Sequence, residues 1–203
     1  MYSTRGGVLF KLNRMETEKI DLDVVWMFAV LKHGEQMYGD LPYVEHLKDV
    51  FNLSKKLGYG KDIQISCILH DVIEDTDTTY DEVKNNFNKE IADIVYCVTD
   101  EDGNDRNERK AKTYNKIKTN WKSIVVKLCD RICNIEKSIT LDIKDKYYMY
   151  LYEQNCLFNS LINDNQNKKE LPVWILLGQY CGLGNDISYK VFIDNLSNNL
   201  VIT

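Results

Sequence analysis

This 203-residue sequence predicts an all-α protein, and three observations support that class. Only two prolines, Pro42 and Pro172, interrupt the chain, and proline is the residue that most disrupts a helix. Apolar residues return at helical spacing through long stretches. Signals for helix starts and ends separate these stretches. The length suits one domain, expected at residues 19–165, with an arm at 1–18 and an extension at 166–203 packed on the same domain.

The first predicted helix spans residues 20–32, and Gly34 suits its end. The Tyr-Gly-Asp sequence at 38–40 predicts a turn. Pro42 is expected to open a second helix, which stops at Gly58. The apolar positions of the first helix are Leu22, Val25, Trp26, Ala29 and Val30.

A third helix is expected to begin at Asp62 and to continue through His70 to Asp75. The sequence from Thr79 to Glu82 has the form of a capping box, with threonine as N-cap and glutamate at the third helical position. The segment therefore predicts the start of a fourth helix.

Residues 91–98 predict another helix, and 99–112 form a charged loop that runs into one more. An apolar segment at 123–128 leads to Asp130, and an aromatic helix is expected at 145–162. The rest is expected to hold a buried segment and a tail, either a short hairpin or coil, at residues 174–177 and beyond 184.

The composition is that of a soluble globular protein, with 44% hydrophobic and 28% charged residues. A net charge of −5 argues against broad nucleic-acid binding. No secretory leader is apparent, and the longest apolar run, residues 24–31, is much shorter than a membrane span. The six cysteines contain no C-x-x-C pair, which favours buried free thiols in a reducing compartment. We therefore expect a cytoplasmic protein without a stable nucleic-acid or membrane complex.

Histidines and acids gather in two short stretches. The three histidines, His33, His46 and His70, fall within one window, and the last is followed directly by Asp71. A second motif, Asp-Arg-Ile-Cys-Asn, begins at Asp130. Imidazole and carboxylate bind divalent metals of the manganese, iron or zinc type. The pattern indicates a metal-dependent hydrolase.

On an uninterrupted helix, the side chains of His70, Asp71, Glu74 and Asp75 would share less than half of the circumference. Acids crowded on one helix face repel each other unless a cation lies between them. A metal ion is the simplest such cation.

His46, from an earlier helix, and Asp130, from a later one, would complete a set of two imidazoles and two carboxylates with His70 and Asp71. An isolated His-Asp pair is weaker evidence, because it also occurs at surfaces and helix ends. His33 either supports the metal ligands or serves as an ordinary helix-end histidine.

Further side chains next to these ligands are candidates for catalysis and binding. Glu74 and Asp75 could orient a metal-bound water or accept its proton; the alternative is a solvated acidic helix end. Asn134 lies one turn after Asp130 and could bond a sugar hydroxyl. The alternative is a structural role, in which its amide bonds one of the metal-binding side chains. Lys127 could meet a phosphate or pair with Asp130.

The densest basic cluster lies around residues 106–112. Arg109 and Lys110 of this cluster are candidate ligands for a phosphate chain. The alternative is a solvated, charged helix face.

Five segments together resemble the HD-domain metal phosphohydrolases, and most closely the alarmone-hydrolase branch, which comprises the RelA/SpoT hydrolase domain and small stand-alone homologues. The resemblance runs from about residue 24 to 140. Its segments are HGEQMYGDLPYVEH (33–46), ILHDVIEDTDTTYDEVKNNF (68–87), IADIVYCVTDEDG (91–103), ERK (108–110) and VKLCDRICNIEKS (126–138).

The resemblance implies an HD-domain helical bundle that binds one Mn²⁺ or another divalent metal. The residues that match the family's ligands are His46, His70, Asp71 and Asp130. By the same resemblance, Glu74 and Asp75 would activate water for attack on a 3′-pyrophosphate, and Asn134 would contact the ribose of a nucleotide.

The sequence departs from this family in one place. Alarmone hydrolases carry a basic stretch between the first histidine and the Pro-Tyr pair, which helps to hold the guanine nucleotide. Here the stretch is shorter, and Met37, Tyr38 and Gly39 bring no Arg or Lys. The departure concerns recognition of the base rather than the metal.

The leading hypothesis is a 3′-pyrophosphohydrolase of (p)ppGpp-like alarmones, with a small phosphorylated nucleotide as its partner and with room for a homo-oligomer. One alternative is an HD phosphatase with another nucleotide substrate, such as a 5′- or 2′-phosphate. Another is a non-catalytic HD module that binds a metal or nucleotide. The pair of Glu74 and Asp75 argues against this last alternative, because a binding module does not need it.

Overall fold

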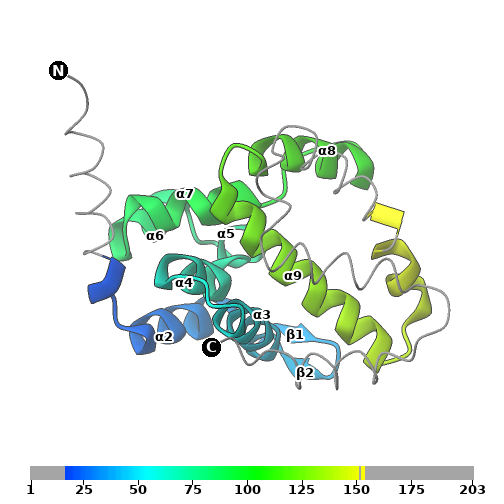
Figure 1. The fold of residues 1–203 in the computed structure, drawn as a ribbon, viewed down its shortest axis with the longest axis horizontal. Helices are drawn as coiled ribbons and strands as arrows, with labels where there is room; N and C mark the ends of the chain where they lie inside the picture. The colour runs from blue at the N-terminus through cyan, green and yellow to red at the C-terminus, as the bar shows by residue number, and fades with distance from the viewer. Residues whose placement is uncertain (1–16, 151, 154–203) are drawn as a thin grey trace.

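The computed structural model describes residues 17–150 and 152–153, and most of them lie in helices (Figure 1). The elements of the first half are α2 (Leu22–His33), β1 (Met37–Tyr38), β2 (Leu41–Pro42), α3 (Val44–Lys56), α4 (Lys61–Leu69) and α5 (Val72–Asp75). Those of the second half are α6 (Tyr80–Asn86), α7 (Lys89–Val98), α8 (Arg106–Ile117) and α9 (Trp121–Thr140). The arrangement confirms the predicted all-α class.

Several predictions fall outside the described residues. These are most of the N-terminal arm (1–16), the second half of the aromatic helix (154–162) and the extension at 166–203, including its expected buried segment and tail. They stay predictions. Residues 144–150 are helical, as expected for the start of the aromatic helix.

Polar side chains form the N-caps of many of these helices. The Thr79 hydroxyl accepts a hydrogen bond from the Glu82 backbone N–H at 3.2 Å, which confirms the N-cap half of the predicted capping box. The Glu82 carboxylate pairs with Lys32 of α2 (Nζ–Oε1, 3.0 Å) and so links two helices. The other helices with such a side-chain cap begin after Asp21, Asn88, Asp105 and Asn120.

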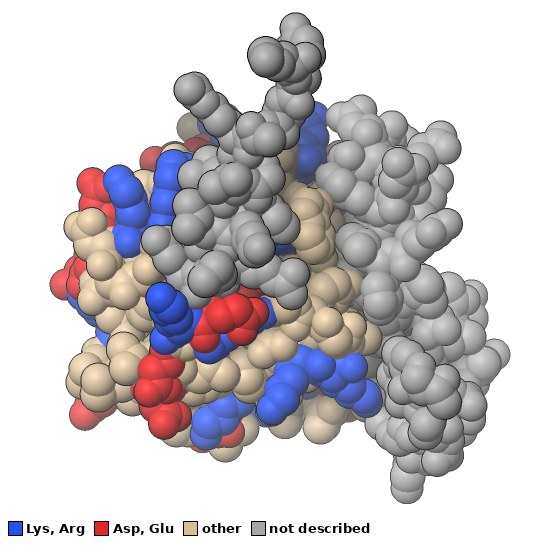
Figure 2. Space-filling view, turned by 60° about the vertical axis from the view of Figure 1, so that its left-hand side comes forward, with Lys and Arg blue, Asp and Glu red and all other residues tan. Residues whose placement is uncertain are grey.

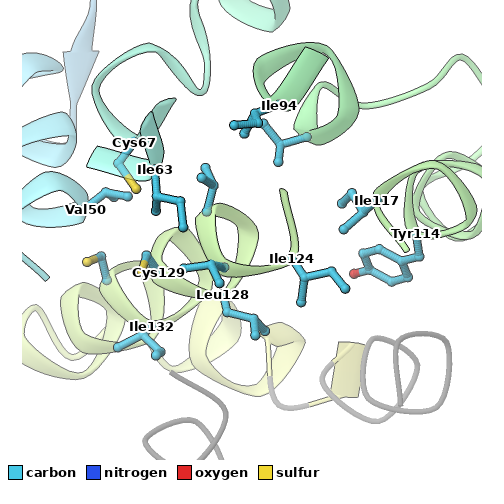
Figure 3. Packing of buried hydrophobic residues seen from close by; sticks show 14 of the residues in the cluster. Val50, Ile63, Cys67, Ile94, Tyr114, Ile117, Ile124, Leu128, Cys129 and Ile132 are labelled. Carbon is cyan, nitrogen blue, oxygen red and sulfur yellow. The ribbon is translucent and has the colours of Figure 1, made fainter. Parts of the chain in front are cut away.

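Helix α9 packs against α3, α4 and α7, and most of its residues are buried. Its apolar side chains form one core cluster with side chains of α3, α4, α7 and α8 (Figure 3). A second cluster joins α2 to α3, α4, α6 and α7. Burying one large aliphatic side chain contributes roughly 1.5–3 kcal/mol to folding. Because α4 contributes to both clusters, the residue that follows it, His70, is firmly placed and only 1% exposed.

Two local predictions on the first helices are wrong. Helix α3 begins at Val44 rather than at Pro42, because Pro42 lies in β2 opposite Met37. The predicted turn is present between the two strands, and Gly39 has the positive φ of 64° that such a turn favours. Val30, expected in the core, is 46% exposed on α2.

The third helix also differs from the prediction. It ends at Leu69, and a separate short helix begins at Val72. Between them, Asp71 has φ −106° and ψ 0°, close to the sparsely populated bridge region. The helical wheel therefore does not describe His70 to Asp75. The break matters because adjacent residues of a continuous helix point about 100° apart.

The described surface carries charges of both signs, and the described cysteines are free thiols, as the composition predicts. On the face drawn in Figure 2, Lys and Arg side chains are interspersed with Asp and Glu. Among the described residues, no helix is both long and apolar enough to cross a membrane. Cys67, Cys129 and Cys133 are buried free thiols as predicted, and Cys97 is half-buried. The remaining cysteines, Cys156 and Cys181, lie outside the described residues.

Candidate metal centre

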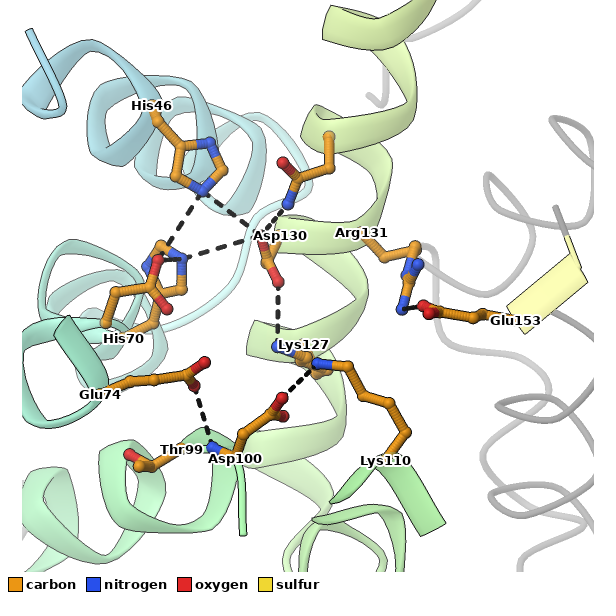
Figure 4. Close-up of polar contacts among 12 residues, drawn as sticks. His46, His70, Glu74, Thr99, Asp100, Lys110, Lys127, Asp130, Arg131 and Glu153 are labelled. Atoms are coloured by element: carbon orange, nitrogen blue, oxygen red, sulfur yellow. Dashed lines mark hydrogen bonds and ion pairs between the residues drawn. The ribbon is translucent and has the colours of Figure 1, made fainter. Parts of the chain in front are cut away.

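Three helical segments bring histidine and carboxylate side chains together. His46 lies on α3, His70 directly follows α4, and Asp130 lies on α9. One ligand atom from each lies within 4.8 Å of the others, so this group could hold a metal ion (Figure 4). The Asp130 Oδ1 atom is 3.3 Å from His46 Nε2 and 3.8 Å from His70 Nε2. All three side chains are buried.

Asp71, the fourth predicted ligand, borders the same group. Its Oδ2 atom lies 2.8 Å from His70 Nε2 and 4.0 Å from His46 Nε2. The Tyr43 hydroxyl donates a hydrogen bond to this oxygen. Burial and the charge of Asp71 raise the pKa of Tyr43, so the hydroxyl keeps its proton and stays a donor. The structure thus brings all four predicted ligands together.

The His70 ring is oriented as a metal ligand requires. Its Nδ1 atom lies 2.9 Å from the Cys67 carbonyl oxygen, which can only accept, so Nδ1 carries the proton. The lone pair of a neutral ring is then on Nε2. This buried atom has no hydrogen-bond partner among the described residues, despite its short distance to Asp71. A nitrogen fixed in this way by a carbonyl bond on the other side of the ring is typical of metal-binding histidines.

The carboxylates of the group attract positive charge. Burial alone would lower the pKa of His70, but the carboxylates of Asp71 and Asp130 outweigh burial and raise it. Burial opposes ionisation of both aspartates, yet the histidines and Lys127 hold their carboxyl pKa values below the usual range. Two buried carboxylates therefore draw positive charge into the group. A divalent ion would supply it, and the two-nitrogen, two-carboxylate donor set fits such an ion.

Further contacts fix the Asp130 carboxylate. The Lys127 Nζ atom lies 3.1 Å from its Oδ2. Burial would lower the pKa of Lys127, but the charges of Asp130 and Glu74 raise it, so Lys127 stays charged. The Asn134 side-chain amide donates to Asp130 Oδ1. The Asn134 carbonyl oxygen accepts from the Tyr38 hydroxyl at 2.5 Å, so both ends of this amide are engaged within the protein.

Glu74 and Asp75 lie on α5, beside the metal group. Glu74 Oε2 accepts a hydrogen bond from the Asp100 backbone N–H at 2.9 Å. Burial raises the pKa of Glu74 against the opposing charge of Lys127. Asp75 accepts from the Gln36 amide at 2.8 Å.

His33 is the last residue of α2 and does not join the metal group. Its Nδ1 atom lies 2.7 Å from Gln36 Oε1, and its ring stacks on Tyr43 at 4.7 Å between centroids. Gln36 bonds Asp75 and Tyr43 bonds Asp71. His33 thus contacts Gln36 and Tyr43, which in turn bond Asp75 and Asp71. This position is compatible with the first of its two predicted roles, support of the metal ligands.

A cavity of about 160 Å³ opens over these residues. Its lining includes His46, Asp71 and Asp130 of the metal group, but not the buried His70, together with Glu74 and Asp75. The basic side chains that line it are Arg106, Lys110, Lys127 and Arg131, together with the aromatic residues Tyr38, Tyr43 and Tyr150.

The cavity is lined by Lys110 but not by Arg109. Arg106, one helical turn before Lys110, lines the cavity instead, and this spacing of four residues was the available signal for it. Arg106 and Arg131 both pair with Glu153, and Arg131 Nη2 lies 2.9 Å from Glu153 Oε2. Lys110 pairs with Asp100 at 2.6 Å (Figure 4).

Residues 25–146 match the family model described as HD domain. The chain belongs to the HD domain family. The matched range contains every predicted metal ligand, and HD domains with this donor set support a divalent-metal site.

Several relatives of this HD domain are alarmone hydrolases by name. A guanosine-3′,5′-bis(diphosphate) 3′-pyrophosphohydrolase of Aquifex aeolicus is 34% identical over 122 residues, which cover 57% of this chain and 17% of the relative. The enzyme of the same name from Drosophila melanogaster, MESH1, is 28% identical over 139 residues, 61% of this chain and 76% of the relative. The chain thus spans most of the small relative but a minor part of the large one.

The fold is also that of a solved structure. The structure of a metazoan ortholog of SpoT that hydrolyzes ppGpp matches with a TM-score of 0.61 at 20% identity. The match covers 78% of this chain and 94% of that one. At this level of identity, the likeness shows the fold.

Proposed function

We propose that this protein is a metal-dependent phosphohydrolase of nucleotides, and specifically a 3′-pyrophosphohydrolase of (p)ppGpp-like alarmones. The observation that carries the proposal is the position of the buried Nε2 atom of His70, which has no hydrogen bond within the described part of the chain and faces two carboxylates and a second imidazole. The named activity of the relatives then selects the reaction among those that HD domains with this donor set can support.

The ion we propose is Mn²⁺, bound by two imidazoles and two carboxylates without any thiolate. Such a mixed nitrogen and oxygen set suits manganese, iron or zinc, and the resemblance to the HD-domain metal phosphohydrolases favours manganese among them. The ligands are His46, His70, Asp71 and Asp130. When bound, the ion would polarise a phosphoryl oxygen and lower the pKa of a water molecule.

Glu74 is the proposed proton acceptor for the attacking water. It lines the cavity, and burial raises its pKa, so it is a stronger base than an exposed glutamate. The Asp100 N–H bond leaves Oε1 of Glu74 available to water. Asp75, held by Gln36, would orient the same water.

The reaction balances without a further reactant. Water attacks the phosphorus attached to the ribose 3′-oxygen, and the bond between that phosphorus and the 3′-oxygen breaks. The 3′-oxygen takes a proton, and pyrophosphate leaves. Lys127, Lys110 and Arg106 line the cavity and would hold the negative phosphate oxygens. Asn134 also lines the cavity and would contact the ribose through the second lone pair of its carbonyl oxygen.

A second candidate is a phosphohydrolase of another nucleotide. It is favoured by the hairpin, where Met37, Tyr38 and Gly39 carry no cation that could hold the phosphates or base of a guanine nucleotide. The metal group and Glu74 would serve that reaction equally well.

An assay of purified protein with Mn²⁺ distinguishes these functions. ppGpp and a panel of nucleoside mono- and diphosphates are incubated with wild type and Glu74→Gln, and released pyrophosphate and orthophosphate are measured separately. Pyrophosphate from ppGpp by wild type alone supports the first candidate. Orthophosphate from other nucleotides supports the second. No release across the panel by protein that binds Mn²⁺ would overturn both and indicate a binding module.

A further inference from the structure

Tyr38 lies in the cavity, and the proposed reaction assigns it no step. It is the last residue of β1, within the stretch that departs from the family's basic pattern. Its ring stacks on the His46 ring, with centroids 4.7 Å apart and planes 27° apart. Its hydroxyl donates to the Asn134 carbonyl oxygen at 2.5 Å. One side chain thus contacts a proposed metal ligand and the amide next to another.

The hydrogen bond from Tyr38 to Asn134 connects Tyr38 to a second proposed metal ligand, Asp130. Because the Asn134 carbonyl oxygen accepts from Tyr38, its NH₂ group faces the opposite way and donates to Asp130 Oδ1. This oxygen is also the one that lies 3.3 Å from His46 Nε2. A reversed amide would place its oxygen against the Asp130 carboxylate, where two acceptors repel. The Asp130 carboxylate thus sets the orientation of the amide, and the Tyr38 hydroxyl holds the amide in place by donating to its carbonyl oxygen.

The hairpin holds Tyr38 in place. Tyr38 pairs with Leu41 across a two-residue turn whose first residue, Gly39, has a positive φ. The edge of the Tyr43 ring packs on Tyr38, with centroids 6.0 Å apart. Burial raises the pKa of Tyr38, with a smaller contribution from Asp130, so the hydroxyl keeps the proton that it donates. Its position and protonation both suit a permanent donor.

We propose that Tyr38 is a positioning residue of the metal centre, which fixes the His46 ring by stacking and the Asp130 carboxylate through Asn134. The inference rests on the metal site of the proposed function. According to this inference, the shortened hairpin supports the metal ligands and does not bind the nucleotide. Residues that hold metal ligands by hydrogen bonds typically contribute 10–100-fold to metal affinity.

Mn²⁺ affinity, measured by titration calorimetry on metal-free protein without nucleotide, tests this role. Tyr38→Phe keeps the ring and loses the hydroxyl, so we expect about tenfold weaker binding. Tyr38→Leu loses the stacked ring as well and should bind still more weakly. Tyr80→Phe is the matched control, because it removes a tyrosine bond to a carboxylate, Asp93, outside the cavity. It should bind Mn²⁺ as wild type does.

The route through Asn134 is tested by a double-mutant cycle. Once Asn134→Ala has removed the amide, adding Tyr38→Phe should cost less than twofold, because the two side chains act in series. Excess Mn²⁺ should restore kcat of Tyr38→Phe with little change in KM, and the melting temperature of the metal-free variant should equal that of wild type.

Three results would contradict the inference or a part of it, and they are distinguishable. If wild type binds Mn²⁺ and Tyr38→Phe binds it equally well, Tyr38 has no positioning role, while the proposed function stands. Fully additive losses in the cycle would refute the route through Asn134. If wild type binds no divalent ion, the metal centre itself is wrong, and the role of Tyr38 fails with it.

Discussion

The metal group and the partly buried group around Lys122 both bring carboxylates close together, and the two groups balance this negative charge in different ways. In one, Lys122 at the start of α9 contacts the carboxylates of Asp62 and Glu90 from two other helices. In the other, Asp71 and Asp130 face His46 and His70. The first group contains its own cation. In the second, Lys127 contacts one oxygen of Asp130, and the His70 Nε2 atom makes no hydrogen bond to any described residue although it faces both carboxylates.

The difference shows how a structural ion pair can be distinguished from a metal site. Buried acids occur in both groups, so acidity and burial do not distinguish them. The distinguishing features are the donor set and the His70 Nε2 atom, which makes no hydrogen bond to any described residue. We therefore expect the two groups to respond oppositely to substitution: loss of function in one, loss of stability in the other.

The largest effect is expected from Asp71→Ala. It removes one proposed ligand and the acceptor of the Tyr43 hydroxyl. Mn²⁺ affinity should fall by more than about 100-fold, beyond the range seen for residues behind the ligands, and hydrolysis should stop. Calorimetry and the nucleotide assay measure the two losses. A variant that keeps wild-type affinity would remove Asp71 from the ligand set.

Glu74→Gln should separate binding from turnover within the same group. The amide preserves the size of the side chain but cannot accept a proton. We expect Mn²⁺ affinity within twofold of wild type and kcat lower by about 10²–10⁴-fold, the usual contribution of a general base. Steady-state kinetics at saturating Mn²⁺ measures the change. Full activity of this variant would contradict the assigned role.

Lys122→Met tests the structural group. It leaves the carboxylates of Asp62 and Glu90 without the cation between them. Because these acids are 17% and 23% exposed, the loss should be about 2 kcal/mol, below the 3–5 kcal/mol of a fully buried pair. Urea unfolding measures it.

The matched control is Lys89→Met. It breaks an exposed pair with Asp93 and should leave the free energy of unfolding close to that of wild type, because solvent screens such pairs. Mn²⁺ affinity should be unchanged in both lysine variants. A loss of affinity in Lys122→Met alone would mean that the two groups are coupled.

The pH dependence of stability gives the smallest effect. Burial would lower the pKa of Lys122, but its hydrogen bonds to Asp62 and Glu90 raise it above the ordinary 10.5. A raised folded-state pKa means that this stabilisation is complete below the unfolded value and is lost as pH rises through the folded one. The difference in unfolding free energy between wild type and Lys122→Met should therefore be constant up to about pH 10 and narrow above it. A constant difference at higher pH would contradict this account.

Short-range patterns predicted most of the described helices, because helix caps and apolar spacing depend on residue type. The Thr79 cap, for example, is confirmed. The break at His70 and Asp71 was not predicted, since nothing in the residue types there ends a helix. It depends on how the two core clusters hold α4 and α5.

Long-range contacts could not be predicted from the sequence. The spacing of Arg106 from Lys110 gave a signal for its place at the cavity, but not for its pairing with Glu153, 47 positions away. Tyr38 contacts Asn134 across 96 positions of sequence, and Lys122 contacts two distant acids. Such pairs depend on the packing of whole helices, which no local pattern encodes.

The most direct test is a crystal structure of Mn²⁺-loaded protein, with anomalous diffraction recorded at the manganese edge. We predict one strong peak among the Nε2 atoms of His46 and His70 and the carboxylates of Asp71 and Asp130, and none beside Lys122. A peak elsewhere, or the four side chains in place with no peak between them in protein saturated with Mn²⁺, would contradict the account.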